Sequence, residues 1–63
     1  MQILSQLTTT TTIYEVIVEE NRYTYKEYLD DRGKIIDWEL FNDKDELIYD
    51  DDLAEYIAEQ IYM

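Results

Sequence analysis

Apolar and polar residues alternate along three stretches of the chain, and this pattern predicts three β-strands. The first stretch, residues 13–20, reads IYEVIVEE, and the second, residues 22–29, reads RYTYKEYL. The third, residues 34–41, reads KIIDWELF. A period of two places alternate side chains on opposite faces of a sheet. The predicted apolar face comprises Tyr14, Val16, Val18, Tyr23, Tyr25, Leu29, Ile36, Trp38 and Leu40.

The first two strands should form a hairpin with a two-residue turn at residues 20–21. This turn sets Val18 opposite Tyr23 on the apolar face. On the other face it sets Glu15 opposite Lys26, and cross-strand pairs of opposite charge are favourable. We therefore expect this register for the first hairpin.

The second hairpin should have an even number of loop residues between Leu29 and Ile36. An even loop brings Leu29 opposite Ile36 and Tyr25 opposite Leu40. An odd loop would turn the apolar residues of the third strand to the charged face, which is penalised wherever one face is buried.

Residues 29–36 (LDDRGKII) and residues 41–48 (FNDKDELI) share one pattern of apolar, acidic or amide, and basic positions. The likeness predicts a second tight turn near residues 42–45, followed by a short fourth strand at residues 47–50. Asp45 stands where the first copy has Gly33, and aspartate tolerates the left-handed conformation better than most residues.

The C-terminal residues have helical spacing. Asp52 is the predicted N-cap, with Glu55 completing a capping box, while Asp50 and Asp51 lie near the positive end of the helix dipole. The apolar positions fall on one stripe of the helix. They are Leu53, Ala54, Ile57, Ala58 and Ile61.

The predicted fold class is therefore α+β: an antiparallel β-meander of three to four strands with one C-terminal helix packed across one face. The helix stripe needs an apolar surface to pack on, and the apolar sheet face supplies it. The expected buried cluster is Tyr25, Leu29, Ile36, Trp38, Leu40, Leu53, Ile57 and Ile61.

The N-terminal residues 1–12 (MQILSQLTTTTT) carry no charged side chain and are rich in threonine. Their β-branched side chains favour extended structure, so this segment either extends the first strand or is disordered. Residues 13–63 are expected to form a single domain of meander and helix. A chain of this size buries only about 60% of its unfolded surface, so the domain is small and marginal.

Composition excludes several kinds of chemistry. The 63 residues include no cysteine and no histidine, which excludes disulfides, thiolate or imidazole metal sites, and Cys-His or Ser-His catalysis. The formal net charge is −11, so direct binding to nucleic acid or to an anionic membrane is unfavourable. No apolar stretch approaches the ~20 residues of a membrane span. We expect a cytoplasmic protein.

The acidic residues do not form a recognisable catalytic or metal site. Asp37 and Glu39 share a sheet face at roughly 7 Å, but a domain of this size has little material for a cleft, so we expect no enzyme. Read as a calcium loop from Asp43, the chain has Ile48 where the loop needs glycine. At most a weak surface site for Ca²⁺ or Mg²⁺ remains, and no cofactor is expected.

The density of acidic residues has a better explanation in partner binding. Carboxylates two apart on a strand, or three to four apart on a helix, form rows of negative charge. Duplex DNA also presents rows of charge, about one per 1.7 Å of axis. A basic surface, in particular that of a nucleic-acid-binding protein, is the complementary partner. The candidate partner-binding residues are Asp37, Glu39, Asp43, Asp45, Glu46, Asp50, Asp51, Glu55, Glu59, Tyr49 and Tyr56.

In its size, acidity, absence of cysteine and histidine, and combination of tyrosines with acids, the chain resembles the small acidic DNA-mimic inhibitors that phages and mobile elements encode. These include several anti-CRISPR and anti-restriction proteins. The resemblance implies inhibition by occupation of a nucleic-acid site, in the host-cell cytoplasm if the chain is phage-encoded. It contains no specific motif, so it assigns no residue.

A second hypothesis is a structural or regulatory interaction domain, such as a homodimer joined through an exposed strand, the Tyr-rich surface or the outer sheet face. The outer face carries apolar side chains between its charges, and a dimer would cover them. They are Ile13, Ile17, Tyr28, Ile35 and Phe41. Five tyrosines exceed what a small core holds and either serve an interface or lie at the surface. They are Tyr14, Tyr28, Tyr49, Tyr56 and Tyr62.

Overall fold

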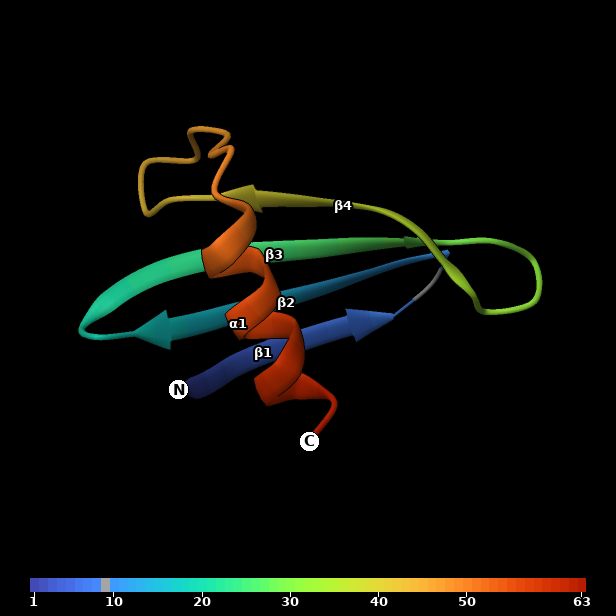
Figure 1. The fold of residues 1–63 in the computed structure, drawn as a ribbon, viewed down its shortest axis with the longest axis horizontal. Coiled ribbons are helices and arrows are strands. Elements are labelled where there is room, and N and C mark those ends of the chain that lie inside the picture. The colour runs from blue at the N-terminus through green and yellow to red at the C-terminus, as the bar shows by residue number, and fades with distance from the viewer. Residues whose placement is uncertain (9) are drawn as a thin grey trace.

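Each strand of the chain pairs with the next one in sequence, and a helix crosses one face of the resulting sheet (Figure 1). In this computed structural model the backbone is described for residues 1–8 and 10–63, and the side chains for residues 1–4 and 10–63. The elements are β1 (Gln2–Thr8), β2 (Thr11–Val18), β3 (Asn21–Leu29), β4 (Ile35–Phe41) and α1 (Asp51–Ile61). The predicted α+β meander with a C-terminal helix is confirmed.

The N-terminal segment forms a strand of its own. β1 pairs antiparallel with β2, with Gln6 opposite Tyr14 and Thr8 opposite Thr12. The sequence leaves two options for residues 1–12, an extended first strand or disorder; in the structure Thr11 and Thr12 extend β2, and β1 is additional. Thr9 lies outside the described residues. Polar residues dominate β1, so it shows no alternation that would reveal a strand.

The prediction of a fourth strand at residues 47–50 is wrong. In the described structure this segment contributes an isolated bridge between Phe41 and Leu47, and the Ile48 N–H donates to the Leu40 carbonyl at 2.8 Å. Asp50 already caps α1, so too few residues remain between the preceding turn and the helix for a strand.

The two similar segments fold into the same kind of turn, as their sequences predict. Asp30 Oδ1 accepts the backbone N–H groups two and four residues further on, both at 2.9 Å. Asn42 Oδ1 accepts the equivalent groups at 2.9 and 3.0 Å. The fourth residue of each turn has positive φ, +79° for Gly33 and +62° for Asp45. Aspartate therefore takes the left-handed position that glycine holds in the first turn.

The β2–β3 hairpin turns one residue earlier than predicted, at Glu19 and Glu20, which both have positive φ. Positive φ at both central residues is the requirement of a type I′ turn, whose twist suits a two-residue hairpin. Val16 consequently lies opposite Tyr23, and Glu15 lies opposite Thr24 rather than Lys26. The strands have slipped by two residues relative to the predicted register, so every side chain keeps its predicted face.

The β3–β4 hairpin agrees with its prediction at one end and differs at the other. Tyr25 lies opposite Leu40, as expected. A register shift follows Tyr28, so Leu29 lies opposite Ile35 instead of Ile36. Residues 30–34 connect the two strands, so the prediction of an even loop is wrong. This bulge turns Ile36 into solvent, and its side chain is 65% exposed. Its prediction as a core residue is therefore wrong.

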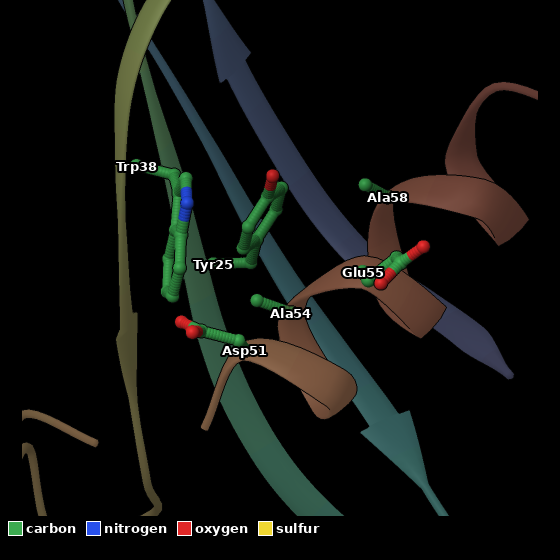
Figure 2. Close-up of a pocket in the computed structure, with 6 residues that line it drawn as sticks. All are labelled: Tyr25, Trp38, Asp51, Ala54, Glu55 and Ala58. Atoms are coloured by element: carbon green, nitrogen blue, oxygen red, sulfur yellow. The ribbon is translucent and has the colours of Figure 1, made fainter. Parts of the chain in front are cut away.

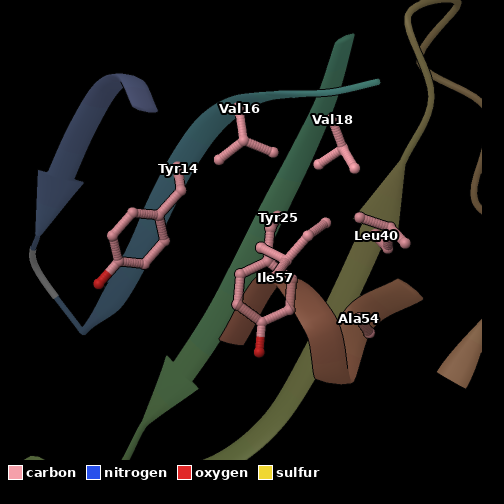
Figure 3. Packing of buried hydrophobic residues seen from close by; sticks show 7 residues of the cluster. All are labelled: Tyr14, Val16, Val18, Tyr25, Leu40, Ala54 and Ile57. Carbon is pink, nitrogen blue, oxygen red and sulfur yellow. The ribbon is translucent and has the colours of Figure 1, made fainter. Parts of the chain in front are cut away.

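The core lies between α1 and the sheet (Figure 3). Tyr25, Leu40 and Ile57 of the predicted cluster are buried, whereas Leu29 and Ile36 lie outside the cluster. The buried members are Tyr14, Val16, Val18, Tyr25, Leu40, Ala54 and Ile57. The partly buried side chains packed against them are Tyr23, Trp38, Ile48, Leu53, Ala58 and Ile61.

The helix is capped by Asp50, not by Asp52 as predicted. Asp50 has an extended backbone, and its Oδ1 accepts the Leu53 N–H at 3.0 Å. Each of the three consecutive aspartates could provide this bond, because any Asp is a favourable N-cap. The helix is observed to begin at Asp51, and with this start Ala54 and Ile57 are its buried residues.

One carboxylate is buried among the apolar side chains. Glu27 follows Tyr23 and Tyr25 on the helix-facing side of β3, and its side chain is 1% exposed. Tyr25 Oη donates to Glu27 Oε2 at 3.2 Å, and Tyr62 Oη donates to Oε1. A buried charge needs such hydrogen bonds, since an unpaired ion is very unfavourable in an apolar environment. Tyr62 thereby ties the end of α1 to β3.

The tyrosines around Glu27 resist ionisation. Burial, followed by the negative charge of Glu27, raises the pKa of Tyr14 and Tyr25. Burial and the hydrogen bond to Glu27 raise the pKa of Tyr62. The hydroxyl groups of Tyr14, Tyr25 and Tyr62 therefore stay protonated near the buried Glu27 carboxylate.

Replacing Leu40 by Ala should lower the free energy of unfolding by about 2–5 kcal/mol, because it removes a fully buried side chain and leaves a cavity. The exposed Ile36→Ala control should change it by less than about 0.5 kcal/mol. Urea denaturation followed by Trp38 fluorescence measures both. Equal effects of the two variants would show that the β3–β4 register is wrong.

Tyr62→Phe should lower the free energy of unfolding by about 1.5 kcal/mol, the lower end of the range for a hydrogen bond to a charged group. The lower end applies because Tyr62 is 59% exposed, so water competes for its place. Tyr49→Phe is the matched control, since Tyr49 is almost fully exposed and should be neutral. A neutral Tyr62→Phe would mean that the hydroxyl does not hold the helix end in solution.

Stability should fall as the pH rises above about 10, the ordinary tyrosine pKa. Tyr14, Tyr25 and Tyr62 have raised pKa values in the folded state, so above that pH the unfolded chain releases protons that the native chain retains. Their contribution is constant at neutral pH and is lost on the alkaline side. Denaturant titrations at increasing pH, with tyrosinate absorbance recorded in parallel, test this. Ionisation of all tyrosines near pH 10 without unfolding would contradict it.

Candidate functional site

Two hollows lie on either side of Trp38, and acidic residues line both. The first, about 420 Å³, lies between α1 and the sheet, and we call it the helix-side hollow (Figure 2). Its lining is Tyr25, Trp38, Asp51, Ala54, Glu55 and Ala58. The second, about 360 Å³, lies along the outer edge of β4, and we call it the edge hollow. Its lining is Asp37, Trp38, Glu39, Leu40, Leu47, Ile48, Tyr49 and Asp51.

The helix-side hollow follows from the sizes of the facing side chains. On β4 and β3, Trp38 and Tyr25 lie with ring centroids 6.5 Å apart and planes tilted by 33°. On α1, the facing residues Ala54 and Ala58 are small and leave space beside the rings. The two aromatic rings therefore face the small side chains of α1 across an open space (Figure 2).

The carboxylates at this hollow come from one side of the helix. Asp51 and Glu55 are four residues apart, so they are neighbours on the helix surface. Asp51 directs its carboxylate toward the Trp38 ring (Figure 2). Asp50 lies beside them in sequence, but Oδ1 of its carboxylate already accepts the Leu53 N–H. Asp51 and Glu55 are the two exposed carboxylates of the hollow.

The edge hollow lies where the outer edge of β4 meets the segment that leads to α1. The Leu40 carbonyl accepts the Ile48 N–H, and Asp37 Oδ1 accepts the Trp38 N–H at 2.8 Å. These bonds occupy backbone groups that an edge strand otherwise offers to another strand. A partner at the edge hollow would therefore contact side chains, because these backbone groups of β4 are already hydrogen-bonded.

The basic residues line neither hollow, although Lys26 is the cross-strand neighbour of Glu39. Arg22 forms an ion pair with Glu15, and the Lys26 ammonium lies 4.9 Å from the centre of the Phe41 ring. These contacts are on the sheet face opposite α1. The other cations, Arg32, Lys34 and Lys44, belong to the two tight turns. No lysine or arginine lines either hollow, so the negative charge around Trp38 is not neutralised locally.

The structure separates the predicted partner-binding residues into groups. Five surround Trp38: Asp37, Glu39, Tyr49, Asp51 and Glu55. Asp45 lines a hollow of about 330 Å³ on the outer face, beside Lys26 and Phe41. Asp43 and Asp45 both line a smaller one of about 170 Å³, beside Arg22. Four lie outside all of these hollows, namely Glu46, Asp50, Glu59 and Tyr56.

The sequence pattern assigns Trp38 to the core and therefore does not predict that it lines the candidate site. Trp38 does pack against the core, but it is only partly buried and forms a wall of both hollows. Tryptophan is large and rarely buried completely. Alanines at helix positions 54 and 58, opposite a large aromatic residue, are the signal in the sequence that could indicate a hollow there.

Several expected tyrosine roles also change. Tyr14 is a core residue, and Tyr62 donates to Glu27, so neither is a free surface tyrosine. Tyr28 donates to Glu39 on the outer face. Tyr49 and Tyr56 remain exposed, and of these Tyr49 lines the edge hollow.

The described residues contain no group of three acidic side chains placed to hold a metal ion. Nor do they include a helix long and apolar enough to cross a membrane. Comparison with protein-family models, with curated proteins and with solved structures gives no match to this chain. The molecule is a small α+β protein with acidic hollows on both sides of Trp38, and we call the helix-side hollow and the edge hollow together the acidic groove.

Proposed function

We propose that this protein binds a basic surface of a partner protein and acts as an inhibitor by occupying a site that the partner uses for nucleic acid. The observation that carries the proposal is the position of Trp38 between unneutralised carboxylates, with Asp51 and Glu55 on one side and Asp37 and Glu39 on the other.

The groove has the chemistry to receive a lysine or, better, an arginine side chain. A cation over the face of a tryptophan is attracted by the ring, and tryptophan is the most favourable aromatic residue for this contact. The planar guanidinium of arginine also stacks on aromatic rings and donates to carboxylates with two parallel bonds. In the helix-side hollow, Trp38 supplies the ring and Asp51 or Glu55 supplies the carboxylate.

The charge of the whole chain supports the same partner. With a net charge of −11, the protein repels phosphates and attracts a basic groove, and such attraction accelerates association. The carboxylates around Trp38 come from a strand and from the first turns of a helix, so they present charges at several positions as a nucleic-acid backbone does. This is the action of the DNA-mimic inhibitors that the composition resembles.

The alternative homodimer through the outer sheet face has less support. Ile13, Ile17, Tyr28 and Phe41 are half-buried on that face in the single chain, whereas Ile35 is exposed. Lys26 covers Phe41, and Tyr28 is bonded to Glu39. Four of the five apolar side chains of the outer face are thus already partly covered within the single chain.

Reversing the charge of Asp51 and Glu55 together, to lysine, should weaken binding of a hexa-arginine peptide by roughly tenfold or more, since it removes the two carboxylates that line the helix-side hollow. Trp38 is the single tryptophan of the chain, so its fluorescence reports the titration. Binding should also weaken from low to physiological ionic strength. Asp50 must be kept, because it caps the helix.

The matched control reverses Glu20 and Asp31, which are exposed in the β2–β3 and β3–β4 turns and change the net charge by the same amount. Asp51→Asn with Glu55→Gln serves as a milder variant if lysine at the helix start destabilises the fold. Equal weakening by both pairs of reversals would show that charge acts without the groove. Once a partner is known, failure of duplex DNA to compete would refute mimicry while leaving the groove in place.

A further inference from the structure

The two outer edges of the sheet differ in how they are protected. At the β4 edge, the Leu40 carbonyl is bonded to Ile48 and the Trp38 N–H to Asp37. β1 is the opposite edge, and among the described strands it pairs with β2 alone. An edge strand with free backbone groups is a template on which another strand can pair.

β1 lacks the side chains that usually prevent such pairing. Natural edge strands are protected by charged residues, especially lysine, or by proline. Residues 2–8 read QILSQLT, with neither. A bulge does interrupt the β1–β2 register between Ile3 and Ser5, which leaves residues 5–8 as the regular part of the edge. At the bulged end, Ile3 and Leu4 are exposed apolar side chains.

The distribution of charge along the chain favours the β1 edge as the place where two copies of this chain meet. Every acidic residue lies between Glu15 and Glu59, and residues 1–14 carry no charged side chain. Two copies with a net charge of −11 each repel one another over most of their surfaces. The β1 edge is the part of the sheet where two copies can approach with the least like charge between them.

We propose that two copies of this chain pair through their β1 strands, antiparallel about a two-fold axis, and join their sheets into one continuous sheet. A two-fold contact uses the same patch on both copies, so a self-complementary strand edge suits it. Main-chain hydrogen bonds supply the pairing, and Ile3 and Leu4 add apolar area. The hollows around Trp38 stay free, because no β1 residue lines them and β4 forms the opposite edge of the sheet (Figure 1).

Sedimentation equilibrium of the full chain should give a mass that rises with concentration toward twice the 7.7 kDa of one chain. Association should strengthen with added salt, because salt screens the repulsion between the copies. Gln6→Glu with Thr8→Glu should weaken association by roughly tenfold or more, since the two-fold axis brings the added charges together. The control, Ile36→Glu with Tyr49→Glu, adds the same charge at the β4 edge and should weaken it much less.

Amide hydrogen exchange of the unaltered chain provides a measurement that needs no variant. Residues 2–8 should exchange more slowly at the concentrations where the dimer forms, while the amides of the two tight turns should not change. A chain that stays monomeric at all accessible concentrations would overturn the proposal. So would a dimer that the β1 variant leaves intact, or one that the β4-edge control disrupts equally.

Discussion

The hydrogen bonding of one buried carboxylate governs how the helix is fixed to the sheet. Glu27 lies beneath α1 with almost no exposure, and a carboxylate in that position is tolerated only if its oxygens are bonded. Tyr25 supplies one hydroxyl from the same strand, and Tyr62 supplies the other from just beyond the last turn of the helix. The helix must therefore cross the sheet so that its end reaches β3. Tyr25 and Tyr62 thus have the role of hydrogen-bonding this one carboxylate.

The sequence predicts the faces of the strands better than their registers, and the reason is geometric. A slip of two residues keeps each side chain on its face, so the alternation of β2 and β3 is compatible with a turn at residues 19–20 or at residues 20–21. The same degeneracy affects the helix start, because three consecutive aspartates are equally good caps. Only packing decides in these cases. The Asp30 and Asn42 turns were predictable, because their side chains and a left-handed fourth residue determine them locally.

Other features escape a reading of the sequence because they contradict local expectation. Glu27 occupies a core-facing position by the alternation of Tyr23 and Tyr25, but nothing in a charge pattern indicates that an acid is buried there. β1 is a strand made mostly of polar residues, and its existence depends on pairing with β2. The groove depends on Trp38 and Ala58, which are 20 positions apart in sequence and meet only because the helix crosses the sheet. The charge pattern of the sequence proposes the acidic residues as a partner surface, whereas it gives no sign that a tryptophan lies among them.

The distribution of charge joins the two proposed associations. No lysine or arginine lines the hollows around Trp38, while β1 carries no charged side chain. A basic partner bound at the groove lowers the net negative charge of each copy, and so lowers the repulsion between two copies that meet at β1. Linkage makes this coupling reciprocal, so dimerisation would in turn raise the affinity of the groove for a basic partner that spans both copies. The same −11 charge that keeps the free chains apart would then favour their assembly once a basic partner is present.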